Sequence, residues 1–161
     1  MKKDNLTVVI PVYNEESNLP MLVDRVVKIM DQSAIHLEAV LVDDGSRDNS
    51  RQILQQLAIS DPRFHVILLS RNHGHQLALT AGLSVARGSE GVFVLDGDLQ
   101  DPPELLDTFY SKHKEGYDVV YAIREKRKEV FYKRFAYFIF YRILKKIAIF
   151  IFIKEINHLE N

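Results

Sequence analysis

The chain has 161 residues, of which 47% are hydrophobic and none is cysteine, which argues against wholesale disorder and excludes disulfides and thiolate metal sites. Its net charge of −1 hides an asymmetry, because residues 1–122 carry 11 Lys and Arg against 18 Asp and Glu, whereas residues 123–161 carry 10 against 4. The acidic part argues against a nucleic-acid partner, which needs clustered Lys and Arg, and the basic part is a candidate surface for anionic lipid.

Short apolar runs alternate with segments of helical periodicity. The first run ends at Pro11 and Val12, and we expect a helix from residue 14 that Asn14 or Ser17 could cap. The run at 91–95 is wholly apolar, which predicts a strand buried on both faces. The alternation predicts an α/β fold with a mostly parallel sheet, helices on both faces and right-handed connections. We expect strands at 6–12, 37–42, 64–69, 91–95 and 119–122, and helices at 14–30, after residue 46, at 75–86 and from Pro102.

Residues 128–161 form a basic and apolar segment after a predicted domain of residues 1–127. Its longest uncharged stretches, 135–141 and 147–153, hold seven residues each, whereas a membrane-spanning helix needs about 20. We therefore expect an amphipathic helix that lies on a membrane surface, or one that packs on protein, including a second copy of this chain. The N-terminus shows no signal peptide, so the expected location is the cytoplasm, including the inner face of a membrane.

Polar side chains follow several of the predicted strands. Each group alone is also typical of a turn or a helix cap, as the Asp-Asp-Gly-Ser sequence at 43–46 illustrates. Because parallel strands end at one edge of a sheet, where ligands of open α/β sheets bind, we expect these groups to share a pocket. The groups are Tyr13, Asn14 and Glu15, then Asp43 and Asp44, then Asp96, Gly97 and Asp98, and lastly Arg124.

Asp96 and Asp98 are the strongest candidates for chemistry. Two carboxylates this close repel each other unless a cation or protons intervene. We expect them to hold a hard divalent cation, with Gly97 permitting close backbone approach to it and Gln100 as a possible additional oxygen ligand. The cation would stabilise a departing diphosphate, which Arg124 would contact through paired hydrogen bonds. The alternative interpretation is a capping cluster in front of the following helix.

His73 and His75 are spaced like metal ligands, but no third ligand is evident, so we favour a loop role or a sugar contact. The helix after them is rich in Ala and Gly, which permits close packing on the sheet or a close ligand. The chain lacks the Gly-x-Gly-x-x-Gly, Walker lysine and Gly-x-Ser-x-Gly motifs.

Five segments together resemble the family 2 glycosyltransferases, which have the GT-A nucleotide-diphospho-sugar transferase fold built on a Rossmann-like sheet. Within that family the chain is most similar to the polyprenyl-phosphate glycosyltransferases, relatives of dolichol-phosphate mannosyltransferase. The resemblance covers about residues 6–127 in the order of the family. The segments are 9–16 (VIPVYNEE), 42–46 (VDDGS), 70–76 (SRNHGHQ), 96–104 (DGDLQDPPE) and 116–121 (GYDVVY).

The resemblance implies a reaction and a role for each segment. The reaction is displacement at the anomeric carbon of the sugar with inversion, by a lipid phosphate that is already anionic and needs little help from a general base. No catalytic base is identified, and Asp98 would support the leaving group through the metal. Either Asp43 or Asp44 would read the base or the ribose. The implied donor-binding residues are Pro11, Tyr13, Asn14, Glu15, Asp43, Asp44, Asp96, Gly97, Asp98, Gln100 and Arg124, with Asp96, Asp98 and Gln100 as the ligands of Mg²⁺ or Mn²⁺.

Members of this branch continue well past residue 161, so we expect mainly the donor-binding half, which binds a nucleotide-diphospho-sugar but transfers it poorly. A sugar-1-phosphate nucleotidyltransferase is the alternative enzyme, although residues 11–15 lack its glycine-rich basic loop. A receiver-like module would need a late lysine, which residues 121–124 do not supply. The remaining alternative is a non-catalytic α/β module that dimerises through its C-terminal segment, and we expect a homo-oligomer in either case.

Overall fold

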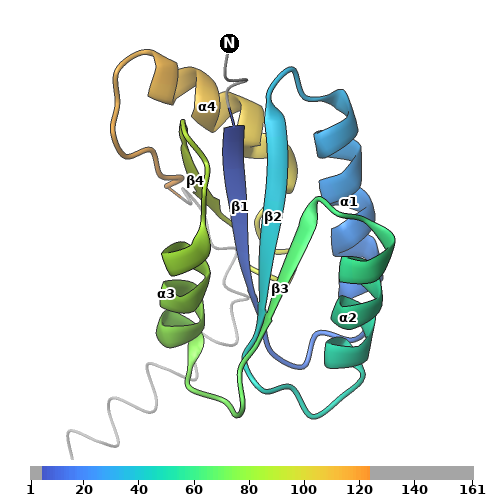
Figure 1. The fold of residues 1–161 in the computed structure, drawn as a ribbon. Coiled ribbons are helices and arrows are strands. Elements are labelled where there is room, and N and C mark those ends of the chain that lie inside the picture. Colours follow the sequence, from blue (N-terminus) through green and yellow to red (C-terminus); the bar gives the residue numbers. More distant parts are fainter. Residues whose placement is uncertain (1–4, 124–161) are drawn as a thin grey trace, which may run out of the picture. The chain divides into compact units, whose positions relative to one another are not determined.

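The computed structural model describes residues 5–123, which form a parallel sheet flanked by helices (Figure 1). The strands are β1 (Asn5–Val12), β2 (His36–Asp43), β3 (Phe64–Leu68) and β4 (Gly91–Val94), in the order β3-β2-β1-β4, and every neighbouring pair is parallel. The helices are α1 (Leu19–Gln32), α2 (Ser50–Ser60), α3 (His75–Val85) and α4 (Leu106–Lys114), the last preceded by a 3-10 turn at Pro103–Leu105. This arrangement confirms the predicted α/β fold with a parallel sheet.

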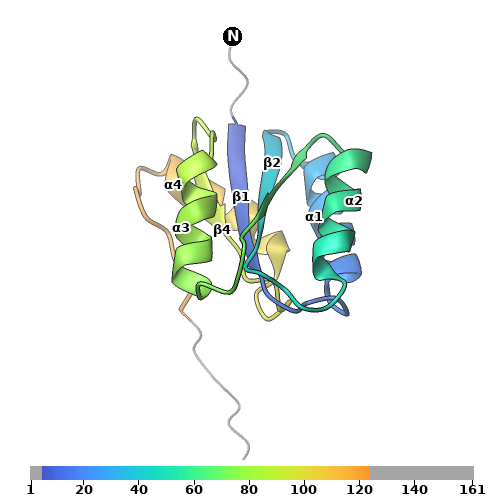
Figure 2. The same cartoon turned by 60° about the horizontal axis from the view of Figure 1, so that its bottom comes forward.

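The two faces of the sheet carry different helices, and Figure 2 shows α3 on the side of the strands opposite to α1 and α2. One core joins Val8 and Ile10 of β1 to side chains of α1, α2 and α4, and the other joins Val9 of β1 to Ala78 of α3. Gly82 lets α3 approach closely, because a Cβ at this position would overlap the side chain of Val9. The small residues of this helix therefore serve packing on the sheet.

β4 corrects one prediction, because it is buried on one face only. Phe93 packs against the core with α1 and α4, but Val92 and Val94 on the opposite face are 41% and 44% exposed. The reason is position: β4 is an edge strand of the sheet formed by residues 5–123, and the α3 core is built on β1 and β2. An apolar run therefore predicted the strand correctly and its burial wrongly.

The predicted strand at 119–122 is also wrong, since these residues are not in a strand. Val119 is 78% exposed and Tyr121 is 74% exposed. β-branched and aromatic residues favour a strand, but a strand needs a neighbour with which to form hydrogen bonds, and the part of the chain described here pairs nothing with this run.

The first helix begins later than predicted, at Leu19, and neither Asn14 nor Ser17 caps it. Asn14 lies outside the helix, with a φ of 55°, and its side chain accepts a hydrogen bond from the Arg47 N–H in the loop after β2. The predicted amphipathic helix, the dimer contact and the domain boundary at residue 127 all lie outside the described residues. Within residues 5–123, the structure contains no helix of the length and apolarity needed to span a membrane.

Candidate functional site

A pocket of about 260 Å³ lies where the carboxyl ends of β1, β2 and β4 meet the start of α3. This is the edge at which ligands bind in open parallel sheets. A second pocket, of about 130 Å³, lies beside β4 and α4 and is mostly apolar. The larger pocket is lined by Pro11, Val12, Tyr13, Glu15, Asp44, Asn72, His75, Ala78, Asp96, Gly97 and Asp98.

The two aspartates after β4 are held in the pocket by the apolar residues around them. Leu95 is fully buried, and Leu99 packs against the same core. Asp98 Oδ1 accepts a hydrogen bond of 3.0 Å from the Gln100 N–H, and Leu99 between them has a φ of 61°, which is rare for a bulky residue. Buried Leu95 and partly buried Leu99 therefore anchor the turn that carries the two carboxylates.

Gly97 brings the end of β4 against the end of β1. A Cβ at this position would lie 3.0 Å from the carbonyl oxygen of Pro11 and 3.8 Å from Cγ of Glu15. The sequence suggested that this glycine allows close approach to a ligand, and the approach that the structure contains is to β1. Its effect is to place Asp96 and Asp98 beside Pro11 and Tyr13 in one pocket.

The pocket is strongly acidic. Four carboxylates line it, and within residues 5–123 no Lys or Arg does so. Asp96 and Asp98 offer hard oxygen ligands, which suit Mg²⁺ or Mn²⁺. Among the described residues there is no group of three or more His, Cys, Asp or Glu arranged to hold a metal ion. Two carboxylates fit a cation that takes its other ligands from water and from substrate phosphates, as Mg²⁺ commonly does.

Asp44 is the member of the Asp43–Asp44 pair that reaches the pocket. Its carboxylate is almost fully buried and accepts hydrogen bonds from the backbone N–H groups of His73, at 2.7 Å, and Gly74, at 2.9 Å. The pair of bonds fixes the turn that leads into α3. Asp44 therefore lines the pocket and also positions the loop beside it.

Asp43 does not line the pocket, and its contacts are structural. Its side chain is 0% exposed, and its two oxygens accept hydrogen bonds from Arg51 Nε, at 2.9 Å, and from the Ser46 N–H, at 3.1 Å. These contacts tie the end of β2 to α2. The contacts of Asp43 therefore agree with the interpretation of Asp-Asp-Gly-Ser as a turn.

The loop after β1 is joined to the loop after β2 by hydrogen bonds between side chains and backbone. Asn14 Oδ1 accepts a bond of 2.8 Å from the Arg47 N–H, and Ser50 Oγ accepts one of 2.9 Å from the Glu15 N–H. Burial raises the pKa of Asp48, but hydrogen bonds from Ser50 and Glu16 outweigh it and hold the pKa below its ordinary value. These contacts make Asn14 a link between loops and place Glu15 at the rim.

Three of the predicted donor-binding residues, Asn14, Asp43 and Gln100, do not line the pocket in the described structure. The contacts of Asn14 and Asp43 are given above. Gln100, the third, is exposed and belongs to the turn after Asp98. Arg124 lies outside the described residues. Conversely, Asn72 and His75 line the pocket, although neither was among the predicted donor-binding residues and His75 had only been expected to have a loop role or a sugar contact. Their motif was visible in the sequence, but only the packing of α3 on β1 and β2 shows that it reaches this pocket.

Comparison with known proteins places the chain in a family. The family model for Glycosyl transferase family 2 matches residues 7–158. The uncharacterized glycosyltransferase YkcC of Bacillus subtilis (strain 168) is 48% identical over 139 residues, which are 86% of this chain and 43% of the relative. The undecaprenyl-phosphate 4-deoxy-4-formamido-L-arabinose transferase of Shewanella sediminis (strain HAW-EB3) is 41% identical over 145 residues, 89% of this chain and 43% of the relative. The chain thus spans less than half the length of these relatives.

Solved structures share the fold. S. aureus TarS 1-349 in complex with UDP-GlcNAc matches with a TM-score of 0.57 and 25% identity, over 76% of this chain and 38% of that chain. The mannosyltransferase PcManGT from Pyrobaculum calidifontis in complex with GDP-Man and Mn²⁺ matches with a TM-score of 0.52 and 28% identity, over 58% and 27%. The predicted GT-A fold is confirmed by these neighbours, and the chain belongs to the family 2 glycosyltransferases.

Proposed function

We propose that residues 5–123 bind the donor of a metal-dependent sugar transfer, with a nucleoside-diphospho-sugar seated in the acidic pocket. The observation that carries the proposal is the pair Asp96 and Asp98 at the end of β4, inside a pocket whose described lining has four carboxylates and neither Lys nor Arg. The four carboxylates repel a diphosphate, and a cation that offsets this repulsion should strengthen its binding. We therefore expect weak donor binding without the cation and much tighter binding with it.

Asp96 and Asp98 would hold the cation, which is Mg²⁺ or Mn²⁺. The Mn²⁺ complex of the Pyrobaculum mannosyltransferase supports a divalent cation in this fold. The chemistry that the bound cation supplies is neutralisation of the charge that develops on the diphosphate leaving group. Tyr13, Glu15 and Asp44 would border the nucleotide part of the donor, and Gln100 and Arg124 remain proposed donor contacts.

The acceptor that we propose is a polyprenyl phosphate, because several relatives are named undecaprenyl-phosphate transferases. An oxygen of that phosphate would attack the anomeric carbon while the bond from this carbon to the diphosphate oxygen breaks, with inversion. The nucleoside diphosphate leaves with the electron pair, and no general base is needed because the attacking oxygen already carries charge. Such an acceptor lies in a bilayer, so we propose that the reaction takes place at a membrane, at its inner face. Membership in the family argues against the nucleotidyltransferase and receiver-like alternatives.

The proposal is tested by binding to the 161-residue chain. UDP, GDP and their sugar derivatives are titrated by calorimetry with Mn²⁺ and again with EDTA, on the unchanged chain and on Asp98→Asn. We expect one nucleoside diphosphate to bind in the presence of Mn²⁺, and Asp98→Asn to weaken that binding about 100-fold, since it removes a charged ligand. Asp24→Asn, an exposed carboxylate on α1, is the matched control and should bind like the unchanged chain. Indifference of the unchanged chain to all of these diphosphates would refute the proposal.

A further inference from the structure

His75 is the basic side chain of the acidic pocket. Within residues 5–123, no other Lys, Arg or His lines it. His75 Nε2 lies 3.8 Å from Asp96 Oδ1, and the two side chains are 52% and 44% exposed. The distance is longer than a hydrogen bond, but both side chains are half exposed and so have room to rotate into hydrogen-bond distance.

The backbone of His75 is held more firmly than its ring. His75 is the first residue of α3, and the two residues before it donate their N–H groups to the buried carboxylate of Asp44. The Gly74 carbonyl accepts bonds from the Leu77 and Ala78 N–H groups, which completes the first turn. The backbone contacts therefore fix the point from which the ring of His75 extends beside Asp96.

We propose that His75 is a positioning residue for the cation site, in which its Nε2–H donates to Asp96 Oδ1 and thereby holds the carboxylate in the orientation in which it would bind the cation. The inference rests on the proposed function, because it concerns the same cation. Carboxylates that bind metals are commonly oriented by such a hydrogen bond, and losing the orienting partner typically costs 10–100-fold in metal affinity. A ring that carries its proton on Nε2 is sufficient, so a positive charge on the ring is not required.

This role differs from that of a metal ligand. A nitrogen that donates its proton to Asp96 cannot use the same atom to bind a cation. The described residues also contain no group of three His, Cys, Asp or Glu arranged around a metal position. The histidine therefore acts through Asp96, and the oxygen ligands remain those of the two aspartates.

His73 provides the matched control. It belongs to the same loop, two residues away, and is exposed, but its side chain does not line the pocket. Its described contribution is the backbone N–H that Asp44 accepts, which a side-chain substitution leaves in place. Any effect of losing an imidazole from the loop in general would therefore appear in His73→Ala as well.

The experiment measures Mn²⁺ binding by electron paramagnetic resonance, with UDP and GDP in parallel, and nucleotide binding in EDTA by calorimetry. His75→Ala should weaken Mn²⁺ binding about tenfold or more and leave nucleotide binding in EDTA unchanged. His75→Gln should restore most of the loss, because its amide nitrogen reaches about as far as Nε2, whereas the shorter His75→Asn should not. His73→Ala should match the unchanged chain.

The outcomes separate this inference from the function on which it rests. Absence of Mn²⁺-dependent nucleotide binding in the unchanged chain would overturn the proposed function. Equal Mn²⁺ affinity in the unchanged chain and His75→Ala would overturn only the role of His75, as would a loss confined to nucleotide binding in EDTA. If His75→Ala fails to fold by circular dichroism, His75→Gln and His75→Asn decide, since equal Mn²⁺ affinity in these two variants also refutes the role.

Discussion

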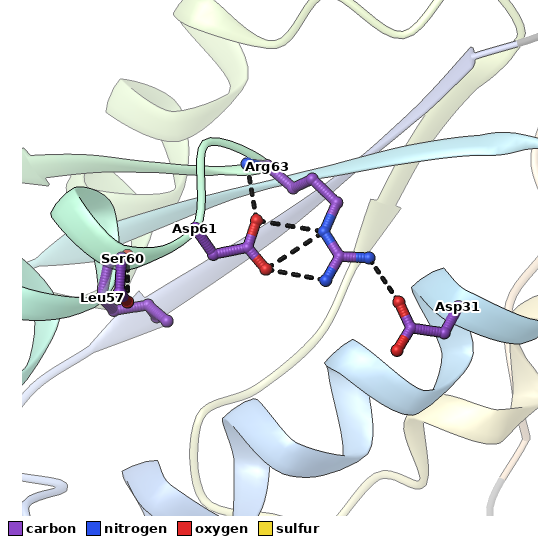
Figure 3. Close-up of polar contacts among 5 residues, drawn as sticks. All are labelled: Asp31, Leu57, Ser60, Asp61 and Arg63. Atoms are coloured by element: carbon purple, nitrogen blue, oxygen red, sulfur yellow. Dashed lines mark hydrogen bonds and ion pairs between the residues drawn. The ribbon is translucent and has the colours of Figure 1, made fainter.

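The two ends of the parallel sheet use charged residues in opposite ways. At the amino end, cations and carboxylates pair with each other. Figure 3 shows Arg63, just before β3, between Asp61 and Asp31. Arg63 Nη2 lies 2.7 Å from Asp61 Oδ2, and Arg63 Nη1 lies 2.6 Å from Asp31 Oδ1. Lys114 and Glu90 form another such pair, at 2.7 Å. At the carboxyl end, Asp43 pairs with Arg51, but four other carboxylates line one pocket that no described Lys or Arg lines.

This difference shows where the molecule keeps unbalanced charge. Exposed ion pairs at the amino end contribute little each and neutralise themselves. The carboxyl end keeps negative charge in a small volume, a costly arrangement that a cation relieves. Changes at the carboxyl end should therefore affect the fold or ligand binding strongly, whereas changes at the amino end should affect stability weakly and ligand binding not at all.

The largest expected effect on stability is that of Gly45→Ala, in the loop after β2. Gly45 has a φ of 69°, and a Cβ there would lie 2.6 Å from the backbone nitrogen of Asn72, which cannot move aside without moving the loop of the pocket. We expect a loss of about 4 kcal/mol or more in the free energy of unfolding, measured in urea. Gly74→Ala is the control, because it has a φ of 92° but no described atom within 4 Å of the added Cβ, and it should lose only about 1–3 kcal/mol. Equal losses would show that overlap with the Arg71–Asn72 backbone is unimportant.

Asp43→Asn comes next and separates a structural carboxylate from a ligand-binding one. The substitution leaves Arg51 without its charged partner and weakens the bond to the Ser46 N–H in a fully buried place. We expect a loss of about 2–4 kcal/mol by urea unfolding, with Mn²⁺-dependent nucleotide affinity retained in the folded fraction. Asp24→Asn, on the surface of α1, should change stability by less than about 0.5 kcal/mol. Full stability combined with lost nucleotide binding would return Asp43 to the donor-binding residues.

The sequence could predict the order of the elements because periodicity is local, and the four strands and four helices begin and end within a few residues of the predicted positions, apart from the late start of α1. It could also predict that Asp44, Asp96 and Asp98 line one pocket, because parallel topology brings the carboxyl ends of the strands to the same edge of the sheet. It could not separate Asp43 from Asp44, since adjacent residues point to opposite sides and either can cap a turn. The exposure of Val94 and the place of His75 depend on where α3 packs, which is a long-range property.

The smallest expected effect is at the amino end, in Arg63→Met. The Arg63 side chain, which is 30% exposed, hydrogen-bonds to Asp61 and holds the pKa of that carboxyl below its ordinary value. A lowered folded-state pKa stabilises the fold above the ordinary Asp pKa of about 4, and this stabilisation is lost as the pH falls through the lowered value.

Arg63→Met should therefore lose about 0.5–1 kcal/mol at pH 7, and the difference from the unchanged chain should shrink in urea titrations repeated between pH 5 and about pH 2. Lys28→Met, which removes a more exposed pair with Asp24, is the control and should lose less at every pH. Nucleotide binding with Mn²⁺ should be the same in all three chains, because neither pair borders the pocket. A weaker nucleotide affinity in Arg63→Met would contradict this, since it would mean that charges at the amino end of the sheet act on the site at the other end.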